Sequence, residues 1–171
     1  LRNGYTTGTC AAAAAKAAAA FLLCGKADSD YSELTLPGGT VCRIQVTRYE
    51  PEQETESPAF CYFVQKDSGD DPDVTNGTKV FARVRQADKS EFETLCRTGA
   101  GYYLEEYPQL YLNGGQGIGM VTKPGLSCPV GHYAVNPVPR SMILGAVADV
   151  VQTAAFEEYL IVTIWIPEGE Q

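Results

Sequence analysis

The sequence predicts an α+β fold, a two-layer sandwich in which helices pack on a mixed or antiparallel sheet. Segments with strand-like alternation come in clusters, and the two clear helical segments stand near opposite ends of the chain. Regular β-α-β alternation, which indicates a parallel sheet with helices on both faces, is absent from the sequence. With 171 residues, the chain is long enough for one domain that buries ~70% of its unfolded surface. We therefore expect a single α+β domain over residues 1–171.

The first expected element is an alanine-rich helix. Residues 11–20 are all alanine except Lys16, and alanine is the strongest helix former because it loses no side-chain entropy. Thr9 is the expected N-cap, and Gly25 stands where a helix stop is expected. A helix over residues 10–24 would be a rod of ~22 Å. Two interpretations stay open: a close-packed structural helix, or a helix whose N-terminus binds an anionic group.

Several strands are expected in the next part of the chain. Residues 33–36 and 41–47 alternate apolar with polar side chains, and Pro-Gly-Gly-Thr joins them as a β-hairpin turn. The proline-bounded acidic stretch 49–58 indicates a solvated loop. Residues 59–65, rich in aromatics, and residues 79–85, which alternate again, predict two further strands.

The second half of the chain is less regular. Residues 86–108 fit either an extended arm or a short helix, and residues 109–112 predict a short strand. Residues 141–156 have helical periodicity, with Pro139 near the start, where a missing N–H costs little. Residues 159–166 predict a final strand. The apolar face of the second helix is expected to contain Met142, Leu144, Val147, Val150 and Val151.

Composition limits the classes of partner. The net charge is −8, and no run of Lys or Arg exists, which argues against nucleic acid or an anionic membrane as a partner. No apolar run reaches ~18 residues, so we expect no membrane span. The six cysteines are scattered without a Cys-x-x-Cys motif, as is typical of buried thiols in a reducing cytoplasm. A cytoplasmic protein is therefore expected.

An acidic loop is the first candidate for chemistry. It carries four carboxylates within seven residues, Asp67, Asp70, Asp71 and Asp73. Because these charges repel, a cation, backbone N–H groups or water must offset them. The spacing does not fit an EF-hand. A solvated turn, a ligand-facing loop and a metal site all stay open as interpretations.

A glycine-rich loop is the second candidate. Gly114, Gly115, Gly117 and Gly119 follow a predicted strand, and glycine there permits either a tight turn or a close backbone approach to a ligand. No helix follows, as a dinucleotide-binding fingerprint requires, and the Gly-Lys-Ser/Thr ending of a phosphate-binding loop is missing. The single histidine, His132, fits an ordinary hydrogen bond or a general base. No catalytic residue is identified from spacing.

Four motifs together carry a specific resemblance. Residues 2–13 read Arg-x-Gly-Tyr-Thr-Thr-Gly-Thr-Cys-Ala-Ala-Ala, and residues 66–75 read Lys-Asp-Ser-Gly-Asp-Asp-Pro-Asp-Val-Thr. Residues 114–126 read Gly-Gly-Gln-Gly-Ile-Gly-x-Val-Thr-Lys-Pro-Gly-Leu, and residues 136–143 read Asn-Pro-Val-Pro-Arg-x-Met-Ile. In order and type, these motifs resemble the CbiD family, the cobalt-precorrin-5B C1-methyltransferases of the anaerobic cobalamin pathway.

The resemblance implies methyl transfer from S-adenosylmethionine to C1 of a cobalt-bearing tetrapyrrole, with cobalt present only within the substrate. Such a step needs in-line positioning and exclusion of water more than a strong base. Local cations would receive the substrate carboxylates, and the acidic loop would face the cationic methyl donor. The implied binding residues are Thr6, Thr7, Gly8, Thr9, Cys10, Asp67, Asp70, Asp71, Asp73, Gly114, Gly115, Gly117, Gly119, Lys123, Asn136 and Arg140.

Family members continue beyond the point that matches residues 164–169, so we expect this chain to be an N-terminal portion of a CbiD-like protein. One alternative is therefore a non-catalytic fragment that binds the tetrapyrrole or mediates assembly. Another is a small-molecule kinase-like domain that uses the glycine-rich loop for phosphate. The residues do not decide which loop holds the methyl donor, and the oligomeric state is not predicted.

Overall fold

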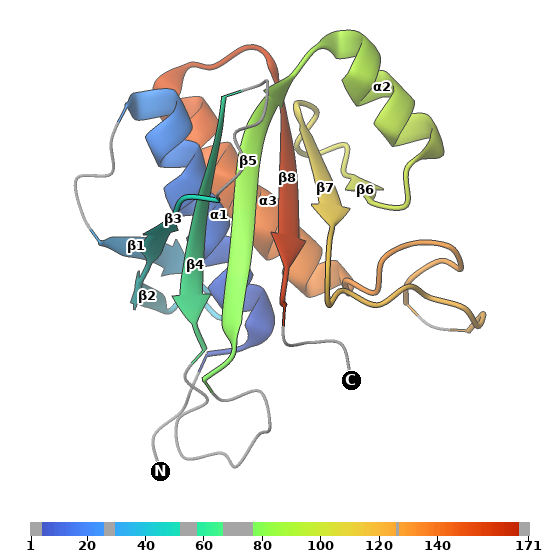
Figure 1. The fold of residues 1–171 in the computed structure, drawn as a ribbon, viewed down its shortest axis with the longest axis horizontal. Helices are drawn as coiled ribbons and strands as arrows, with labels where there is room; N and C mark the ends of the chain where they lie inside the picture. The colour runs from blue at the N-terminus through green and yellow to red at the C-terminus, as the bar shows by residue number, and fades with distance from the viewer. Residues whose placement is uncertain (1–4, 26–29, 52–57, 67–76, 126, 168–171) are drawn as a thin grey trace.

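The computed structural model describes residues 5–25, 30–51, 58–66, 77–125 and 127–167 (Figure 1). The elements, in chain order, are α1 (Thr7–Cys24), β1 (Tyr31–Thr35), β2 (Val41–Gln45), β3 (Thr47–Tyr49), β4 (Ala59–Gln65), β5 (Lys79–Ala87), α2 (Lys89–Thr98), β6 (Tyr102–Tyr103), β7 (Leu110–Gly114), α3 (Pro137–Ala154) and β8 (Tyr159–Trp165).

The main sheet has the strand order β3-β4-β5-β8-β7-β6, and the helices α1 and α3 cover one of its faces (Figure 1). β7 and β8 pair in parallel, whereas the other neighbouring strands pair antiparallel. The remaining helix, α2, packs on the opposite face of this sheet, near one end. The predicted α+β class, with helices packed on a mixed sheet, is confirmed.

The N-cap of α1 is Thr6, so the prediction of Thr9 was wrong. Thr6 has an extended backbone, and its Oγ1 accepts a hydrogen bond from the Thr9 N–H at 3.1 Å. Thr9 lies inside the helix and is 4% exposed. Both threonines carry a capping hydroxyl, and the sequence pattern did not distinguish them. The stop is as predicted, because Gly25 has a φ of 85° and its N–H bonds the Phe21 carbonyl.

α1 lies at the centre of the fold, between the sheet, α3 and the β1–β2 hairpin. Eight of its nine alanines are buried, Ala20 is half-buried, and Ala13, Ala14 and Ala15 have no exposed surface. By length and composition this helix could also cross a membrane, a test that buried core helices pass as well. Here 56% of it is buried inside the protein, which is the packing of a core helix.

The predicted hairpin is confirmed, but β1 and β2 form a separate two-stranded sheet. Two hydrogen bonds attach it to α1: Ser32 Oγ donates to the Ala13 carbonyl at 2.8 Å, and Lys16 Nζ donates to the Glu33 carbonyl at 2.7 Å. The second strand was predicted to reach residue 47, which was wrong. Thr47 instead begins β3, an edge strand of the main sheet that pairs with β4.

The remaining predicted strands are present, as β4, β5, β7 and β8. The undecided stretch 86–108 contains both a helix, α2, and the short strand β6. α3 begins at Pro137, four residues before the predicted start at residue 141, because proline is accepted in the first helical turn. The acidic loop and most of the stretch 49–58 lie outside the described residues.

Candidate functional site

Three of the four motifs meet at one end of the main sheet, the lower end in Figure 1. β7 and β8 run parallel and both end there, while β5, antiparallel to β8, begins there. The N-termini of α1 and α3 reach the same end. β4 ends at Gln65 and β5 begins at Lys79 at this end, so the described ends of the acidic loop, Lys66 and Gly77, lie there too. The Lys66 N–H donates to the Thr78 carbonyl, and the Gly77 N–H donates to the Lys66 carbonyl. The topology therefore gathers segments that are far apart in the sequence.

A cavity of about 160 Å³ lies where these segments meet. Thr7 and Gly8 of α1 line it together with Asn136 and Pro139 at the start of α3. The other lining residues are apolar: Ala11, Val80, Ile118, Ala134, Val135, Ile143, Ile164 and Ile166. The cavity is therefore largely apolar, with polar groups on one wall.

The polar wall consists mainly of the start of α1. The first N–H groups of a helix have no acceptor within it, and here the Thr9 N–H is bonded to Thr6 Oγ1. The N–H groups of Thr7 and Gly8 remain at the positive end of the helix dipole, a favourable position for an anion. α3 contributes less, because Pro137 and Pro139 have no N–H to donate.

Volume limits what the cavity can hold. Sites for drug-sized molecules are typically about 300–1,000 Å³, so 160 Å³ accommodates part of a ligand, such as a carboxylate arm. The whole of S-adenosylmethionine does not fit there. Thr9 and Cys10, two of the predicted binding residues, are 4% and 0% exposed and face the core. Thr6 is exposed and caps the helix.

The predicted glycine-rich loop is held mostly by packing. Gly114 is the last residue of β7, and a Cβ there would lie 2.6 Å from Tyr133 Cδ1. Gly115 lies against Trp165, since a Cβ there would be 3.2 Å from the Trp165 Cβ. Gly117 has a φ of 80°, and a Cβ there would overlap the Ile166 carbonyl. At Gly119 a Cβ would meet nothing within 4 Å.

Arg140 of α3 holds the preceding loop, which contains Ser127 and Val135, in place. Its Nε donates to the Val135 carbonyl at 2.6 Å, and its Nη2 donates to the Ser127 carbonyl at 3.1 Å. Its guanidinium carbon lies 4.0 Å from the centre of the Tyr102 ring. Lys123, the other cation predicted to bind substrate, is exposed on the same loop. The position of the Arg140 side chain is therefore fixed by its contacts with other residues of the protein.

Cys128 lies beside this arginine and is 5% exposed. Its Sγ is 3.5 Å from Arg140 Nη2 and 3.5 Å from Asn136 Oδ1. Burial raises the pKa of the Cys128 thiol, but hydrogen bonds with Tyr102 and Arg140 outweigh burial, and the pKa lies below its ordinary value. His132, further along the same loop, makes an ordinary hydrogen bond, with its Nδ1 3.0 Å from the Gly101 carbonyl oxygen.

The opposite face of the sheet carries a larger groove, about 760 Å³, that sequence reasoning missed. Tyr49, Cys61, Arg83, Thr163 and Trp165 line it from β3, β4, β5 and β8. Gly115 and Gln116 of the glycine-rich loop also line it, so this loop lies between the groove and the small cavity, which Ile118 lines. Alternation along the strands places these side chains on one face of the sheet, but it does not show which face the helices leave uncovered.

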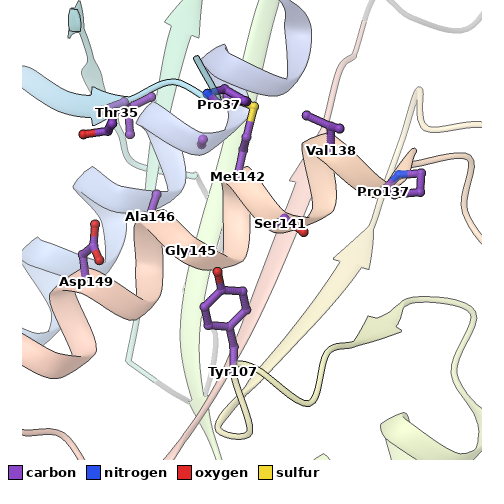
Figure 2. Close-up of a pocket in the computed structure, with 12 residues that line it drawn as sticks. Thr35, Pro37, Tyr107, Pro137, Val138, Ser141, Met142, Gly145, Ala146 and Asp149 are labelled. Carbon is purple, nitrogen blue, oxygen red and sulfur yellow. The ribbon is translucent and has the colours of Figure 1, made fainter. Parts of the chain in front are cut away.

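A third concavity, about 570 Å³, runs along the outer side of α3. Figure 2 shows its walls: Thr35 and Pro37 come from the hairpin region, and Tyr107 points its hydroxyl toward α3 near Gly145. Met142 reaches toward Pro37, and Asp149 lies at the far end. A carboxylate in this lining makes the concavity a poor place for an anionic ligand.

Asp67, Asp70, Asp71 and Asp73 lie outside the described residues. Among the residues that the structure does describe, no group of three His, Cys, Asp or Glu side chains is arranged to hold a metal ion.

Comparisons with known proteins add the family. The family model described as CbiD matches residues 1–171. Two relatives, from Geobacter metallireducens and Moorella thermoacetica, are named cobalt-precorrin-5B C(1)-methyltransferase. They are 45% identical over 171 residues and 43% identical over 169 residues, and the chain spans only 42% and 39% of their lengths.

A solved structure also resembles the chain. It is the cobalamin biosynthesis protein cbiD from Archaeoglobus fulgidus, with 26% sequence identity and a TM-score of 0.65. The match covers 99% of this chain and 45% of the other. Sequence and structure comparisons therefore point to the same family, and the chain spans less than half the length of each of these three proteins.

Proposed function

The chain belongs to the CbiD family, and from that premise we propose that it forms the N-terminal portion of a methyltransferase acting on C1 of cobalt-precorrin-5B. S-adenosylmethionine is the proposed methyl donor, and the pathway is cobalamin biosynthesis. The names of relatives 43% and 45% identical to the chain support the reaction. The observation that carries the proposal for this chain is the meeting of three family motifs at one cavity.

In the proposed reaction, ring carbon C1 attacks the methyl carbon of the sulfonium, the carbon–sulfur bond breaks, and S-adenosylhomocysteine leaves. This chemistry depends on in-line positioning in a site without water. The apolar side chains that line the cavity, among them Val80, Ile143 and Ile164, are proposed to contact the substrate arm that enters it. We propose that the N–H groups of Thr7 and Gly8 receive one carboxylate arm of the substrate.

The methyl donor is proposed to bind near the acidic loop. Four carboxylates attract a sulfonium cation, and the described ends of that loop lie at the same end of the sheet as the cavity. In the longer protein, Asp70→Asn with Asp71→Asn is expected to weaken S-adenosylmethionine binding in calorimetry. Unchanged affinity would contradict this part of the proposal and leave the substrate part standing.

A second candidate function is a non-catalytic portion that binds the tetrapyrrole while the rest of the protein carries the donor. The short span of the match, 42% of one relative, favours it. The small cavity also favours it, because 160 Å³ is below the size of a site for the whole donor.

The deciding experiment uses the chain alone and the chain joined to the C-terminal portion that its relatives have. Each is incubated with cobalt-precorrin-5B and S-adenosylmethionine labelled at the methyl group. Label transfer by both forms supports catalysis within this chain, and transfer by the long form alone supports the second candidate. Transfer by neither form contradicts the proposed reaction.

A matched pair of variants tests the cavity in the active form. Thr7→Asp places a carboxylate at the start of α1, where it suits the helix dipole but repels an anionic substrate arm. Thr7→Asn has nearly the same shape without the charge. We expect Thr7→Asp to lower kcat/KM at least tenfold with unchanged thermal stability, and Thr7→Asn to lower it much less. Equal effects of the two variants would contradict an anion site.

A further inference from the structure

One face of the main sheet is only partly covered in the described chain. Phe92 of α2 packs on Ala87, Tyr111 and Ile161 of the sheet and covers the end of this face near the start of β8. At the other end the 760 Å³ groove opens over β3, β4, β5 and β8. Its size lies within the range of sites for organic ligands, about 300–1,000 Å³.

Beside this groove the sheet carries a continuous row of aromatic rings. The cross-strand register places Phe63 opposite Phe81, and Phe81 opposite Trp165. Phe81 and Trp165 are stacked at 15°, with ring centroids 5.1 Å apart, and Tyr49 meets Phe81 edge-on at 5.0 Å. Tyr49 is 39% exposed. The rings are stacked, tilted or edge-on to one another rather than coplanar, and Phe81 is buried, so Tyr49 and Trp165 are the rings of this row that line the groove.

Two basic side chains lie beside the aromatic row. Arg83 stands in the next row, between Cys61 and Thr163, and all three line the groove. Lys79 Nζ lies 5.0 Å from the centre of the Phe63 ring, at the end of the aromatic row. The acidic Glu50 in the lining is paired with Arg48, with an Nη2–Oε1 distance of 2.9 Å. In the described chain, the groove therefore combines the aromatic rings of Tyr49 and Trp165 with the basic side chain of Arg83.

We propose that this groove binds the face of a carboxylated tetrapyrrole ring. The aromatic row, with Trp165 and Tyr49, contacts the ring, and Arg83 pairs with an acetate or propionate carboxylate. The substrate class rests on the proposed function, whereas the location rests on the groove. The side-chain chemistry of the groove favours this ligand over a segment of protein, because a macrocyclic polycarboxylate combines apolar faces, which suit Tyr49 and Trp165, with carboxylates at its edge, which suit Arg83.

The glycine-rich loop connects the groove with the small cavity. Gly115 and Gln116 line the groove, and Ile118 lines the cavity. The Gly115 N–H donates to the Ile164 carbonyl at 2.9 Å, and the Ile166 N–H donates to the Gln116 carbonyl at 2.8 Å, which fixes this loop against β8. A ring in the groove therefore lies across one loop from the N–H groups at the start of α1.

The test uses residues 1–171 and uroporphyrin III, a tetrapyrrole with eight carboxylates, as the probe. Binding is measured by absorbance titration at two salt concentrations. We expect Arg83→Gln and Trp165→Ala each to raise Kd at least tenfold, whereas Arg83→Lys and Trp165→Phe raise it less. Arg97→Gln, on the exposed surface of α2, is the matched charge control and should leave Kd within twofold.

Unfolding curves accompany each variant, and Arg83→Gln with Trp165→Phe serves as the reference pair should Trp165→Ala fail to fold. Unchanged Kd in a folded Arg83→Gln variant overturns the proposal. A loss of binding in Thr7→Asp, with full binding in Arg83→Gln, also overturns it, because the ligand then occupies the small cavity alone.

Failure of this inference differs from failure of the proposed function. If the long form transfers methyl groups but the Arg83 and Trp165 variants bind uroporphyrin III normally, only the groove is wrong. If the groove variants lose binding but the wild-type long form transfers no label, the groove stands and the methyl-transfer reaction is wrong. In an active long form, Arg83→Gln should raise KM more than it lowers kcat.

Discussion

Gly8 and Pro139 bring the N-termini of α1 and α3 into close contact. A Cβ on Gly8 would lie 3.0 Å from the Pro139 Cβ and 3.2 Å from its Cγ. Both residues line the small cavity, so the contact that joins the two helices also shapes the candidate site. A side chain at position 8 would need the rigid proline ring to shift.

Gly8→Ala is expected to destabilise the protein by up to about 2 kcal/mol. Overpacking costs about 1–3 kcal/mol, which exceeds the gain of about 1 kcal/mol that alanine brings over glycine in a helix. Urea unfolding measures the free energy. A stabilised Gly8→Ala protein would show that α3 moves away easily and that the contact does not set the helix spacing.

The glycine-rich loop offers a matched pair of substitutions. Gly117→Ala should be strongly destabilising, by about 2 kcal/mol or more, because a positive φ and a clash with the Ile166 carbonyl act together. Gly119→Ala has open space around it and should change the free energy of unfolding by less than about 0.5 kcal/mol. Comparable losses in the two proteins would contradict this account of the loop.

Local physics made most of the fold predictable. Alternation located β4, β5 and β8, and alanine content with Gly25 located the body and the end of α1. The start of α1 was missed because Thr6 and Thr9 are both good caps, and only the folded chain shows which of them accepts the hydrogen bond. The start of α3 was missed because two prolines suggested coil, although the first helical turn accepts them.

The candidate site was predictable in part. Thr7, Gly8 and Asn136 were predicted from the motifs, and all three line one cavity. That they meet depends on long-range strand pairing, which no local pattern in the sequence contains. Arg83 and Trp165 were missed because the groove exists only where α2 leaves the sheet uncovered. Such a surface depends on tertiary packing, and alternation along a strand does not reveal it.

Arg140 is expected to be structural as well as near the site. Arg140→Met should lose about 2–3 kcal/mol, because hydrogen bonds from a charged group contribute about 1.5–3 kcal/mol and the contact with Tyr102 adds to them. Arg140→Lys should recover little, because an ammonium cannot reproduce the planar fork of donors. Hydrogen exchange should be faster at Val121 and Gly131, whose N–H groups bond within this loop. Arg97→Met, on exposed α2, is the control and should be nearly neutral.

Tyr102 should make the stability depend on alkaline pH. Its hydroxyl donates to the Tyr133 carbonyl at 2.6 Å, and burial, with hydrogen bonding to Cys128, raises its pKa to about 12. An unfolded tyrosine has a pKa near ~10. The unfolded state therefore loses this proton first, so the stabilisation is complete below pH ~10 and declines as the pH rises toward ~12.

Tyr102→Phe removes this titration. The difference in free energy of unfolding between wild type and Tyr102→Phe is therefore expected to shrink between pH ~9 and ~11.5, as measured by urea unfolding at each pH. A repeat in a Cys128→Ala background separates the tyrosine from the thiol beside it, and Tyr103→Phe on the exposed part of β6 serves as the control. A difference that stays constant over this range would show that the Tyr102 hydroxyl ionises equally well in the folded protein, and that its bond to Tyr133 does not hold the proton.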